Sequence, residues 1–242
     1  MRGSDRIVSD GANNYFLIPR LVVMDEEQLS SIAELREFTV CQLMDGLGRS
    51  YPVETTIRPV DRQFRICGSA LTVECARGDN LTIHHALHIA QPGDVLIVGG
   101  SPDCGAALWG ELMSISAQSK GLEGTIIDGP IRDPLEIRSL GYPVFCRDIN
   151  PSRATKQTYG RINVPVRIGA ISISPKDVVL ADANGIISIA RARAPEAVQL
   201  ASEVVKKEKT IKVQILSGRT LFDIFNLGGY LVQQQTNERN EN

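Results

Sequence analysis

Short apolar runs alternate with amphipathic segments from residue 67 to residue 146, and this alternation limits the possible folds more than any other feature of the chain. The predicted strands cover residues 67–75, 94–98, 124–127 and 143–146, and the predicted helices between them cover 81–90, 105–120 and 134–140. The connections are short, and several contain the Gly and Pro residues that end regular elements. A chain with this rhythm is predicted to form a sheet covered by helices.

The regions on either side have a different pattern. Residues 25–38 and 40–47 predict two opening helices, the second with Thr39 as its N-cap. Residues 162–190 hold several β-rich runs with turn residues between them, and residues 194–216 predict one long helix rich in Glu and Lys. Because there is no repeat and no evident linker, we predict one compact α/β domain.

Composition excludes several function classes. Hydrophobic residues make up 43% of the 242 residues and charged residues 22%, as in globular proteins. The net charge of −2 and the pI near 6.0 argue against a nucleic-acid partner, which needs a basic surface. No run of about 18 apolar residues predicts a membrane span, and the start lacks the apolar core of a signal peptide. The five cysteines form no CxxC motif, which predicts thiols in a cytoplasmic protein.

Arg132-Asp133-Pro134 follows a buried strand and precedes a predicted helix. Asp is a favoured N-cap and Pro a favoured first helical residue, so a helix cap explains Asp133 taken alone. Arg132 has no such explanation, because a cation at a helix N-terminus opposes the helix dipole unless an anion lies there. The position also follows the carboxyl end of a strand, where α/β sheets bind ligands. We therefore expect Arg132 and the helix N-terminus to bind a carboxylate.

Residues 99–111 form the second candidate segment. Its glycine-rich start follows a strand and exposes backbone amides, but it contains neither a dinucleotide-binding pattern nor a P-loop. Composition alone predicts Glu111 to be an exposed helix residue. Cys104 lacks an evident base partner, so we interpret it as a small buried thiol and not as a nucleophile.

The three histidines of the chain are His84, His85 and His88. His84 and His88 are four residues apart on a predicted helix and could share a metal, but two ligands are too few and the glutamate of an HExxH motif is absent. Surface or packing roles are favoured. Residues 182–185 (DANG) could form a metal loop, yet a hairpin turn explains them sufficiently.

Five stretches carry a resemblance to a known family. They are PGDVLIV (92–98), ALWGE (107–111), GLEGTIIDGPIRD (121–133), LGYPVFCRDINP (140–151) and NVPVRIGAISISPKDVVLADANGI (163–186). They resemble the RraA-like family, which includes 4-hydroxy-4-methyl-2-oxoglutarate/4-carboxy-4-hydroxy-2-oxoadipate aldolases and regulators of ribonuclease E. The resemblance implies a compact αββα-type sandwich of the swivelling-domain kind, an α/β fold with mixed sheets covered by helices.

The resemblance also predicts domain bounds. The likeness covers residues 26–218 and leaves two extensions, 1–25 and 219–242. The first opens with MRGSD, which we interpret as a vector remnant, and the second ends in a polar stretch from Gln233 that is predicted to be disordered.

Aldolases of the family carry an acidic residue, twenty intervening positions and then Arg-Asp, and Glu111 with Arg132-Asp133 matches this spacing. The resemblance implies that Asp133 holds Mg²⁺ or Mn²⁺ and that Glu111 is a catalytic group and a further ligand, partly through water. The better-known members have Asp where this chain has Glu111. Arg132 would bind the pyruvate end of a 2-oxo acid and stabilise enolate charge. The implied carboxylate-binding amides belong to Gly105, Ala106, Ala107 and Leu108.

The implied activity is aldol cleavage of a 4-hydroxy-2-oxo acid to pyruvate, with oxaloacetate decarboxylation through the same enolate. The implied assembly is a homotrimer or homohexamer with active sites at subunit interfaces. The rival function is a non-catalytic regulator that binds an RNA-processing enzyme of the ribonuclease E type. A methyltransferase, which is a label in this family, is rejected because no Gly-rich cofactor loop with an acidic ribose contact can be placed.

Overall fold

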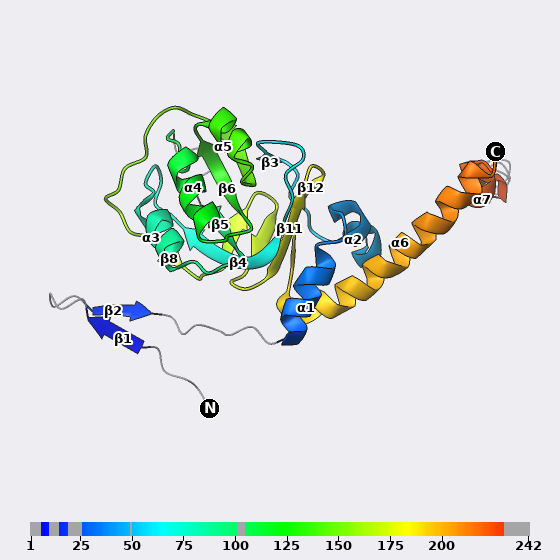
Figure 1. Ribbon diagram of the computed structural model, residues 1–242, viewed down its shortest axis with the longest axis horizontal. Coiled ribbons are helices and arrows are strands. Elements are labelled where there is room, and N and C mark those ends of the chain that lie inside the picture. Colours follow the sequence, from blue (N-terminus) through cyan, green and yellow to red (C-terminus); the bar gives the residue numbers. More distant parts are fainter. Residues whose placement is uncertain (1–5, 10–14, 19–25, 49, 101–104, 230–242) are drawn as a thin grey trace, which may run out of the picture.

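A mixed sheet forms the centre of the computed structural model, which describes residues 6–9, 15–18, 26–48, 50–100 and 105–229 (Figure 1). The strand order is β12-β11-β4-β5-β6-β7-β3, with β8 beside β4. The strands are β3 (Arg58–Pro59), β4 (Ile66–Glu74), β5 (Asp94–Gly99), β6 (Gly124–Ile131), β7 (Val144–Ile149), β8 (Arg161–Ile162), β11 (Val178–Asp182) and β12 (Gly185–Ile189).

Strands β4 to β7 are parallel and form the buried middle of this sheet. Every residue of β5 and β6 is buried, as expected for parallel strands that are covered on both faces. Helices α3 (Leu81–Ile89), α4 (Glu111–Ser119) and α5 (Pro134–Leu140) connect the strands and cover one face (Figure 1). Strands β9 (Val166–Ile168) and β10 (Ile171–Ile173) form a separate hairpin that contacts β5.

Residues 54–59 join the two outer edges of the sheet. Glu54 exchanges backbone hydrogen bonds of 2.9 and 2.8 Å with Ile186 in β12, and Pro59 in β3 pairs with Phe145 in β7. The sheet therefore curls into a nearly closed barrel with helices packed on it. The predicted α/β fold, a mixed sheet covered by helices, is confirmed.

The carboxylate of Glu54 is buried at this closure, with the residue only 1% exposed. Burial alone would raise its pKa, but hydrogen bonds from Thr56, from the amide of Ala170 and from Ile57 outweigh burial and lower it. The Ala170 amide donates to Oε2 at 2.6 Å, which ties the β9–β10 turn to the closing segment. Glu54 is thus a structural anchor.

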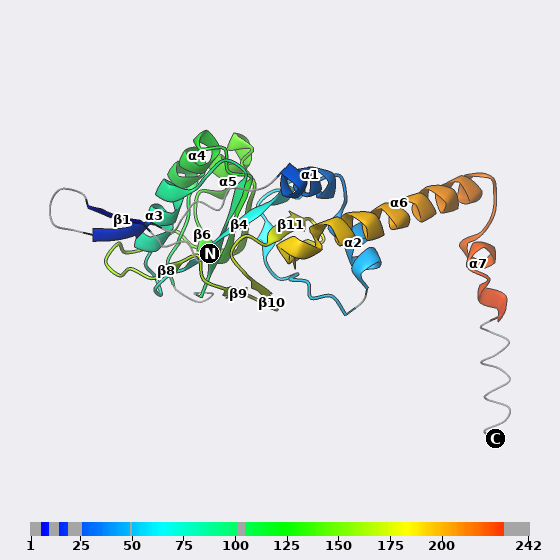
Figure 2. The same cartoon turned by 90° about the horizontal axis from the view of Figure 1, so that it is seen from below.

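A second helical layer packs against β11 and β12. It consists of α1 (Glu26–Leu35), α2 (Val40–Leu47) and the first half of α6 (Ala194–Leu216), which follows a 3₁₀ turn at Arg191–Arg193. Thr39 caps α2 as predicted, and its hydroxyl and the Gln42 side chain form a capping box. Beyond this layer α6 projects from the body and ends at α7 (Leu221–Ile224), as Figures 1 and 2 show.

Two sequence predictions of element bounds are wrong. The helix expected from Gly105 begins only at Glu111, because Gly105 has a φ of 68° and the Gly110 backbone is extended. Strand β6 was expected to end at Ile127, but it continues to Ile131 with a register shift between Ile127 and Pro130. Two smaller differences are that α1 ends at Leu35 and not at residue 38, and that β7 continues to Ile149 and not only to residue 146; the other expected helices and strands are present.

The N-terminal extension contains an antiparallel hairpin of β1 (Arg6–Ser9) and β2 (Tyr15–Ile18). The MRGSD start and the predicted disordered tail from Gln233 lie outside the described residues. Within the described ranges, no helix is long and apolar enough to span a membrane.

Candidate functional site

The candidate site lies where the segment before α4 runs beside the end of β6. The Leu108 amide donates to the Pro130 carbonyl at 2.9 Å, and the Arg132 amide donates to the Trp109 carbonyl at 3.0 Å. These two bonds extend the sheet pattern by one short parallel bridge between Trp109 and Ile131. Helices α4 and α5 therefore begin side by side. Glu111 lies close to Arg132 and Asp133, although twenty residues separate Glu111 from Arg132 in the sequence.

Asp133 has an unusual backbone for a residue with a side chain. Its φ of 58° and ψ of 47° place it in the left-handed region, directly before Pro134. Such a conformation is uncommon outside glycine, although Asp and Asn adopt it more readily than other residues, and non-glycine residues held there concentrate at functional sites. The tight turn directs the Asp133 carboxylate toward the start of α4.

Asp133 occupies the N-cap position of α5 but makes no side-chain cap bond to that helix. Its Oδ2 instead accepts the Glu111 amide at 3.1 Å, so the carboxylate caps α4, the neighbouring helix. The simple explanation of Asp133 as a cap of its own helix is therefore incorrect. Among the described residues, Oδ1 of Asp133 has no hydrogen-bond partner, and it is available for a ligand.

The guanidinium of Arg132 lies beside this carboxylate. Its Nε is 3.5 Å from Asp133 Oδ2, and the two side chains are 41% and 37% exposed. Because this contact is long and partly solvated, it contributes little to stability. It leaves the remaining guanidinium nitrogens able to bind an anion.

Gly110 is a site residue that sequence reasoning missed. A Cβ at Gly110 would lie 2.7 Å from Asp133 Oδ2 and 3.2 Å from Arg132 Nε. The absence of a side chain there lets the carboxylate and the guanidinium approach the first turn of α4. The available signal was a glycine directly before an acidic helix residue, between Trp109 and Glu111.

Trp109 anchors this segment. The residue is 1% exposed, and its indole Nε1 donates to the Ser114 hydroxyl at 2.7 Å. The Ser114 hydroxyl in turn donates to the Gly110 carbonyl at 3.2 Å. The position of Glu111 is thus fixed by its neighbours, while its own side chain is partly exposed.

The predicted carboxylate-binding segment 105–108 is partly engaged within the chain. The Ala107 amide donates to the Ser152 carbonyl at 2.8 Å, and the Leu108 amide donates to Pro130. In the first turn of α4 the amides of Leu112 and Met113 have no acceptor in the helix. The helix N-terminus therefore offers two further donors close to the Asp133 carboxylate.

The donor set at this site fits a hard divalent cation. Asp133 offers one carboxylate oxygen without a partner among the described residues, and Glu111 adds a second carboxylate at the same helix start. Nowhere in the described ranges do three His, Cys, Asp or Glu side chains gather as a metal group. Mg²⁺ is commonly held by one or two carboxylates with water in the other positions, which agrees with such a sparse set.

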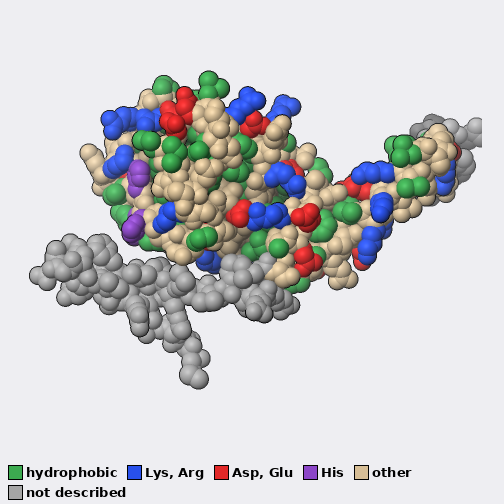
Figure 3. Space-filling view, viewed as in Figure 1, with side chains coloured by type: hydrophobic (Ala, Val, Ile, Leu, Met, Phe, Trp, Pro, Cys, Tyr) green, Lys and Arg blue, Asp and Glu red, His purple; other side chains and the backbone are tan. Residues whose placement is uncertain are grey.

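The remaining candidates have structural explanations. The Nδ1 of His85 lies 2.5 Å from the Tyr159 hydroxyl, and the histidines lie at the surface of α3 (Figure 3). Asp182 accepts the Asn184 amide at 2.8 Å, which agrees with the predicted hairpin turn, and it also accepts the Val40 amide at the start of α2 at 2.9 Å. Cys104 lies outside the described residues.

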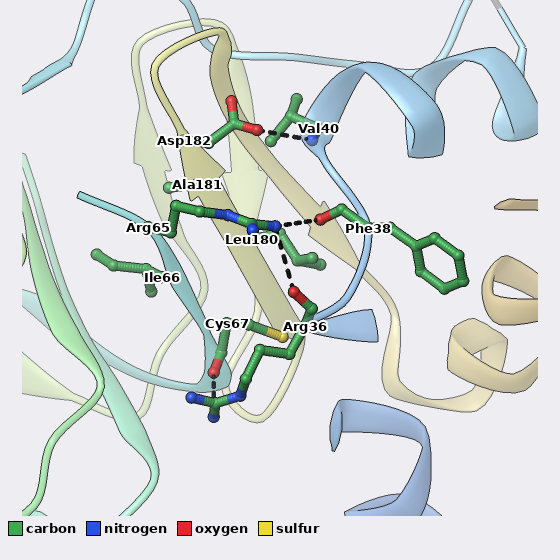
Figure 4. A pocket seen from close by; sticks show the side chains of 9 residues that line it. All are labelled: Arg36, Phe38, Val40, Arg65, Ile66, Cys67, Leu180, Ala181 and Asp182. Atoms are coloured by element: carbon green, nitrogen blue, oxygen red, sulfur yellow. Dashed lines mark hydrogen bonds between the residues drawn. The ribbon is translucent and has the colours of Figure 1, made fainter. Parts of the chain in front are cut away.

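A pocket of about 230 Å³ lies elsewhere, between the α1–α2 connection and strands β4 and β11 (Figure 4). Its polar groups are engaged within the chain. Arg65 donates to the Phe38 carbonyl at 2.7 Å, and Arg36 donates to the Cys67 carbonyl at 3.1 Å. Burial raises the pKa of the Cys67 thiol to about 12, so this cysteine is not a thiolate nucleophile at neutral pH. The pocket is a packing seam between the helical layer and the sheet.

Comparison with known proteins gives a consistent result. A family model described as RraA-like, Aldolase/RraA, matches residues 39–188. A Halalkalibacterium halodurans protein with the provisional name 4-hydroxy-4-methyl-2-oxoglutarate aldolase is 31% identical over 180 residues, which cover 74% of this chain and 86% of the relative. A Shewanella oneidensis protein with the same provisional name is 35% identical over 151 residues, covering 60% and 90%.

Solved structures share the fold. A crystal structure of a Pseudomonas syringae pv. tomato protein of unassigned activity has a TM-score of 0.71 at 26% identity and covers 81% of this chain and 96% of that one. Streptomyces coelicolor RraAS2, described as an unusual member of the RNase ES inhibitor RraA family, has a TM-score of 0.69 at 24% identity, covering 78% and 97%. The second likeness is evidence for the fold alone.

Proposed function

The chain belongs to the RraA-like family, and from this premise we propose that it is a divalent-metal-dependent aldolase that cleaves a 4-hydroxy-2-oxo acid to pyruvate and a second carbonyl compound. The observation that carries the proposal is the geometry of Asp133. A left-handed residue directs its carboxylate to the Glu111 amide, beside the Arg132 guanidinium. A cap of α5 alone would not need this backbone, because a residue that caps its own helix ordinarily has extended angles.

Each side chain has a proposed role. Asp133 would hold Mg²⁺ or Mn²⁺ directly, and Glu111 would hold it through water. The bound ion would act as a Lewis acid that polarises the 2-oxo group. Arg132 would bind the substrate carboxylate and stabilise the negative charge that develops as the C3–C4 bond breaks. The amides of residues 105–108 and the first turn of α4 would orient the pyruvate carboxylate.

The two described segments that form the site, 105–111 and 124–140, contain no lysine. A Schiff base with one of their residues is therefore not available for activating the 2-oxo group. Decarboxylation of oxaloacetate forms the same pyruvate enolate as aldol cleavage. We therefore propose oxaloacetate decarboxylation as a second activity of the site.

Pyruvate release tests the proposal. The protein is incubated with 4-hydroxy-4-methyl-2-oxoglutarate or oxaloacetate, with Mg²⁺ or with a chelator, and pyruvate is measured. We expect metal-dependent release that falls to background in Arg132→Ala and Asp133→Asn. Asn tolerates the left-handed backbone and its oxygen can still accept the Glu111 amide, so Asp133→Asn removes the charge and keeps the local fold. Wild-type rates equal to background with both substrates would refute the activity.

The rival proposal is a regulator that binds an RNA-processing enzyme. It is supported by the names of structural neighbours such as the RNA-processing inhibitor RraA of Thermus thermophilus, whose TM-score is 0.57 at 24% identity. Co-purification with ribonuclease E that persists in Asp133→Asn, together with no pyruvate release by the wild type, would favour the regulator. A homotrimer or homohexamer of the 26–218 domain, with the flanking extensions outside it, is part of the aldolase proposal.

A further inference from the structure

Strand β6 contains one residue more than its neighbour β7 shortly before the candidate site. The backbone pairs that flank the irregularity are Ile127 with Cys146 and Pro130 with Asp148. Asp128 and Gly129 of β6 therefore lie opposite Arg147 of β7 alone. This arrangement is a β-bulge, which is rare between parallel strands and frequent beside functional sites.

The bulge decides which way the residues after it face. Successive side chains of a strand point to opposite faces, so one extra residue reverses the facing of every residue that follows. Arg132 and Asp133 are the next charged residues after the bulge. The same shift places the Ile131 carbonyl where it accepts the Asn150 amide at 2.8 Å. The direction of the two site side chains therefore depends on the register of the bulge.

The carboxylate of Asp128 is bonded on both sides of the bulge. The residue is 5% exposed. Its Oδ1 accepts Nε of Arg147 at 2.7 Å and lies 2.5 Å from Nη2, so the guanidinium is bound directly across the bulge. Its Oδ2 accepts the Gly169 amide at 2.9 Å, in the turn between β9 and β10. A buried carboxylate with charge-assisted bonds to two other segments fixes the backbone that carries it.

The simpler explanation is that Asp128 only stabilises the closed barrel, as Glu54 does. Arg147 Nη1 donates to the Thr56 hydroxyl at 2.9 Å, and that hydroxyl donates to Glu54 at 2.5 Å. The two carboxylates thus belong to one network, and each accepts an amide of the β9–β10 turn. They differ in position, because Glu54 lies on the closing segment and Asp128 lies on the bulge itself.

We infer that Asp128 is a positioning residue that holds the β6 bulge in its register. The bulge in turn directs Arg132 and Asp133 toward the start of α4, where Asp133 accepts the Glu111 amide. The inference rests on the proposed function for its effect on pyruvate release, whereas its effect on the backbone does not depend on any activity.

Two variants separate positioning of the site from closure of the barrel. Asn has one acceptor oxygen where Asp has two, so in Asp128→Asn only one of Arg147 and Gly169 keeps its acceptor. Glu54→Gln is the matched control, because it also removes the charge of a buried carboxylate from this network. It leaves the bonds that Asp128 makes in place.

Hydrogen exchange followed by mass spectrometry measures the backbone of the site without an activity assay. Peptides that span residues 108–113 and 130–134 contain the amides that bond the two site segments to each other. Both variants are measured at a temperature where circular dichroism shows them to be folded. We expect exchange in these peptides to be at least about tenfold faster in Asp128→Asn than in Glu54→Gln.

Steady-state pyruvate release provides the second readout. We expect kcat to fall by at least about tenfold in Asp128→Asn, because the reacting groups are displaced, and to stay at the wild-type value in Glu54→Gln. Arg147→Lys keeps the positive charge but loses the two-nitrogen contact with Asp128, so it should show a smaller change in the same direction. It takes the place of Asp128→Asn if that variant does not fold.

Equal exchange in Asp128→Asn and Glu54→Gln overturns the inference, because both carboxylates would then act only on the closure. A wild-type kcat in Asp128→Asn overturns it as well. A wild-type protein that releases no pyruvate refutes the aldolase proposal instead, and the exchange comparison then decides the role of Asp128 by itself.

Discussion

Replacing Gly110 with alanine perturbs the candidate site by a single methyl group. The Gly110 backbone is extended, with a φ of −167° and a ψ of −170°, which any residue can adopt. Backbone strain therefore contributes nothing to the effect of Gly110→Ala. The new Cβ would lie 2.7 Å from Asp133 Oδ2, which is 0.7 Å closer than an ordinary contact of 3.4 Å.

The carboxylate must move to relieve this overlap. A shift of that size stretches the 3.1 Å bond between the Glu111 amide and Asp133 Oδ2 beyond hydrogen-bond range. The lost bond to a charged acceptor costs about 1.5–3 kcal/mol before solvent screening, and less at this partly exposed site. Displacing a reacting group by about 1 Å costs on the order of a hundredfold in rate. Because the carboxylate moves by somewhat less than 1 Å, we expect Gly110→Ala to reduce the rate of metal-dependent pyruvate release by roughly ten- to a hundredfold.

A matched control uses the same substitution at the other end of α5. Gly141 has a φ of 74°, and nothing lies within 4 Å of its position for a Cβ. Gly141→Ala therefore costs about 1–2 kcal/mol of backbone strain. That loss lowers the melting temperature by roughly 2–4 °C per kcal/mol in a chain of this size. Because Gly141 contacts no site residue, its pyruvate release should equal that of the wild type.

The two variants are compared by thermal unfolding and by steady-state pyruvate release with varied Mg²⁺. Comparable stability with activity lost only in Gly110→Ala is the expected pattern. If Gly110→Ala keeps both the wild-type rate and the wild-type metal requirement, the carboxylate position beside Gly110 is irrelevant to activity and the reasoning is wrong.

Three further predictions concern the site and the body of the protein. Arg132→Lys keeps the charge but loses the planar guanidinium, so kcat should fall by about a hundredfold in the pyruvate assay. Burial would raise the pKa of Asp79, but hydrogen bonds, the strongest from Thr155, lower it to about 2 from 3.8. Asp79 therefore stabilises the fold above pH 3.8, and this contribution disappears as the pH falls toward 2; unfolding in denaturant should show the deficit of Asp79→Asn shrinking over that window. Gly169→Ala puts a Cβ 1.8 Å from Glu54 Oε2 at a φ of 49°, so unfolding should show a loss above about 3 kcal/mol.

The sequence by itself predicted most of the regular elements. Apolar runs gave β4 to β7, and the helix from Ala194 to Leu216 was predicted with its observed bounds. The Thr39 cap was also predicted, because capping depends on residues only three positions apart. Such features are local. The helix and strand propensities of the residues, the spacing of apolar residues and the capping residues therefore predict them without knowledge of the tertiary contacts.

The site was predicted in part for the same reason. The local pattern singled out Arg132 and Asp133 at a helix start, and family spacing added Glu111. The role of the Asp133 carboxylate could not be read in this way, because its hydrogen-bond partner lies on another helix, twenty-two positions away. Gly110 was missed because only a residue without a side chain fits at this position, and that requirement arises from contact between two segments that are far apart in the sequence.

Asp133 shows which features of the site follow from the sequence and which follow only from the tertiary structure. The sequence determined that an acidic residue would stand between an arginine and a proline at the start of a helix. Only the tertiary structure decided that its backbone is left-handed and that its carboxylate caps α4 and not α5. The physical reason is that the bridge between Trp109 and Ile131 brings the α4 amides within reach, and a charged acceptor binds the unsatisfied amides that packing places nearest to it.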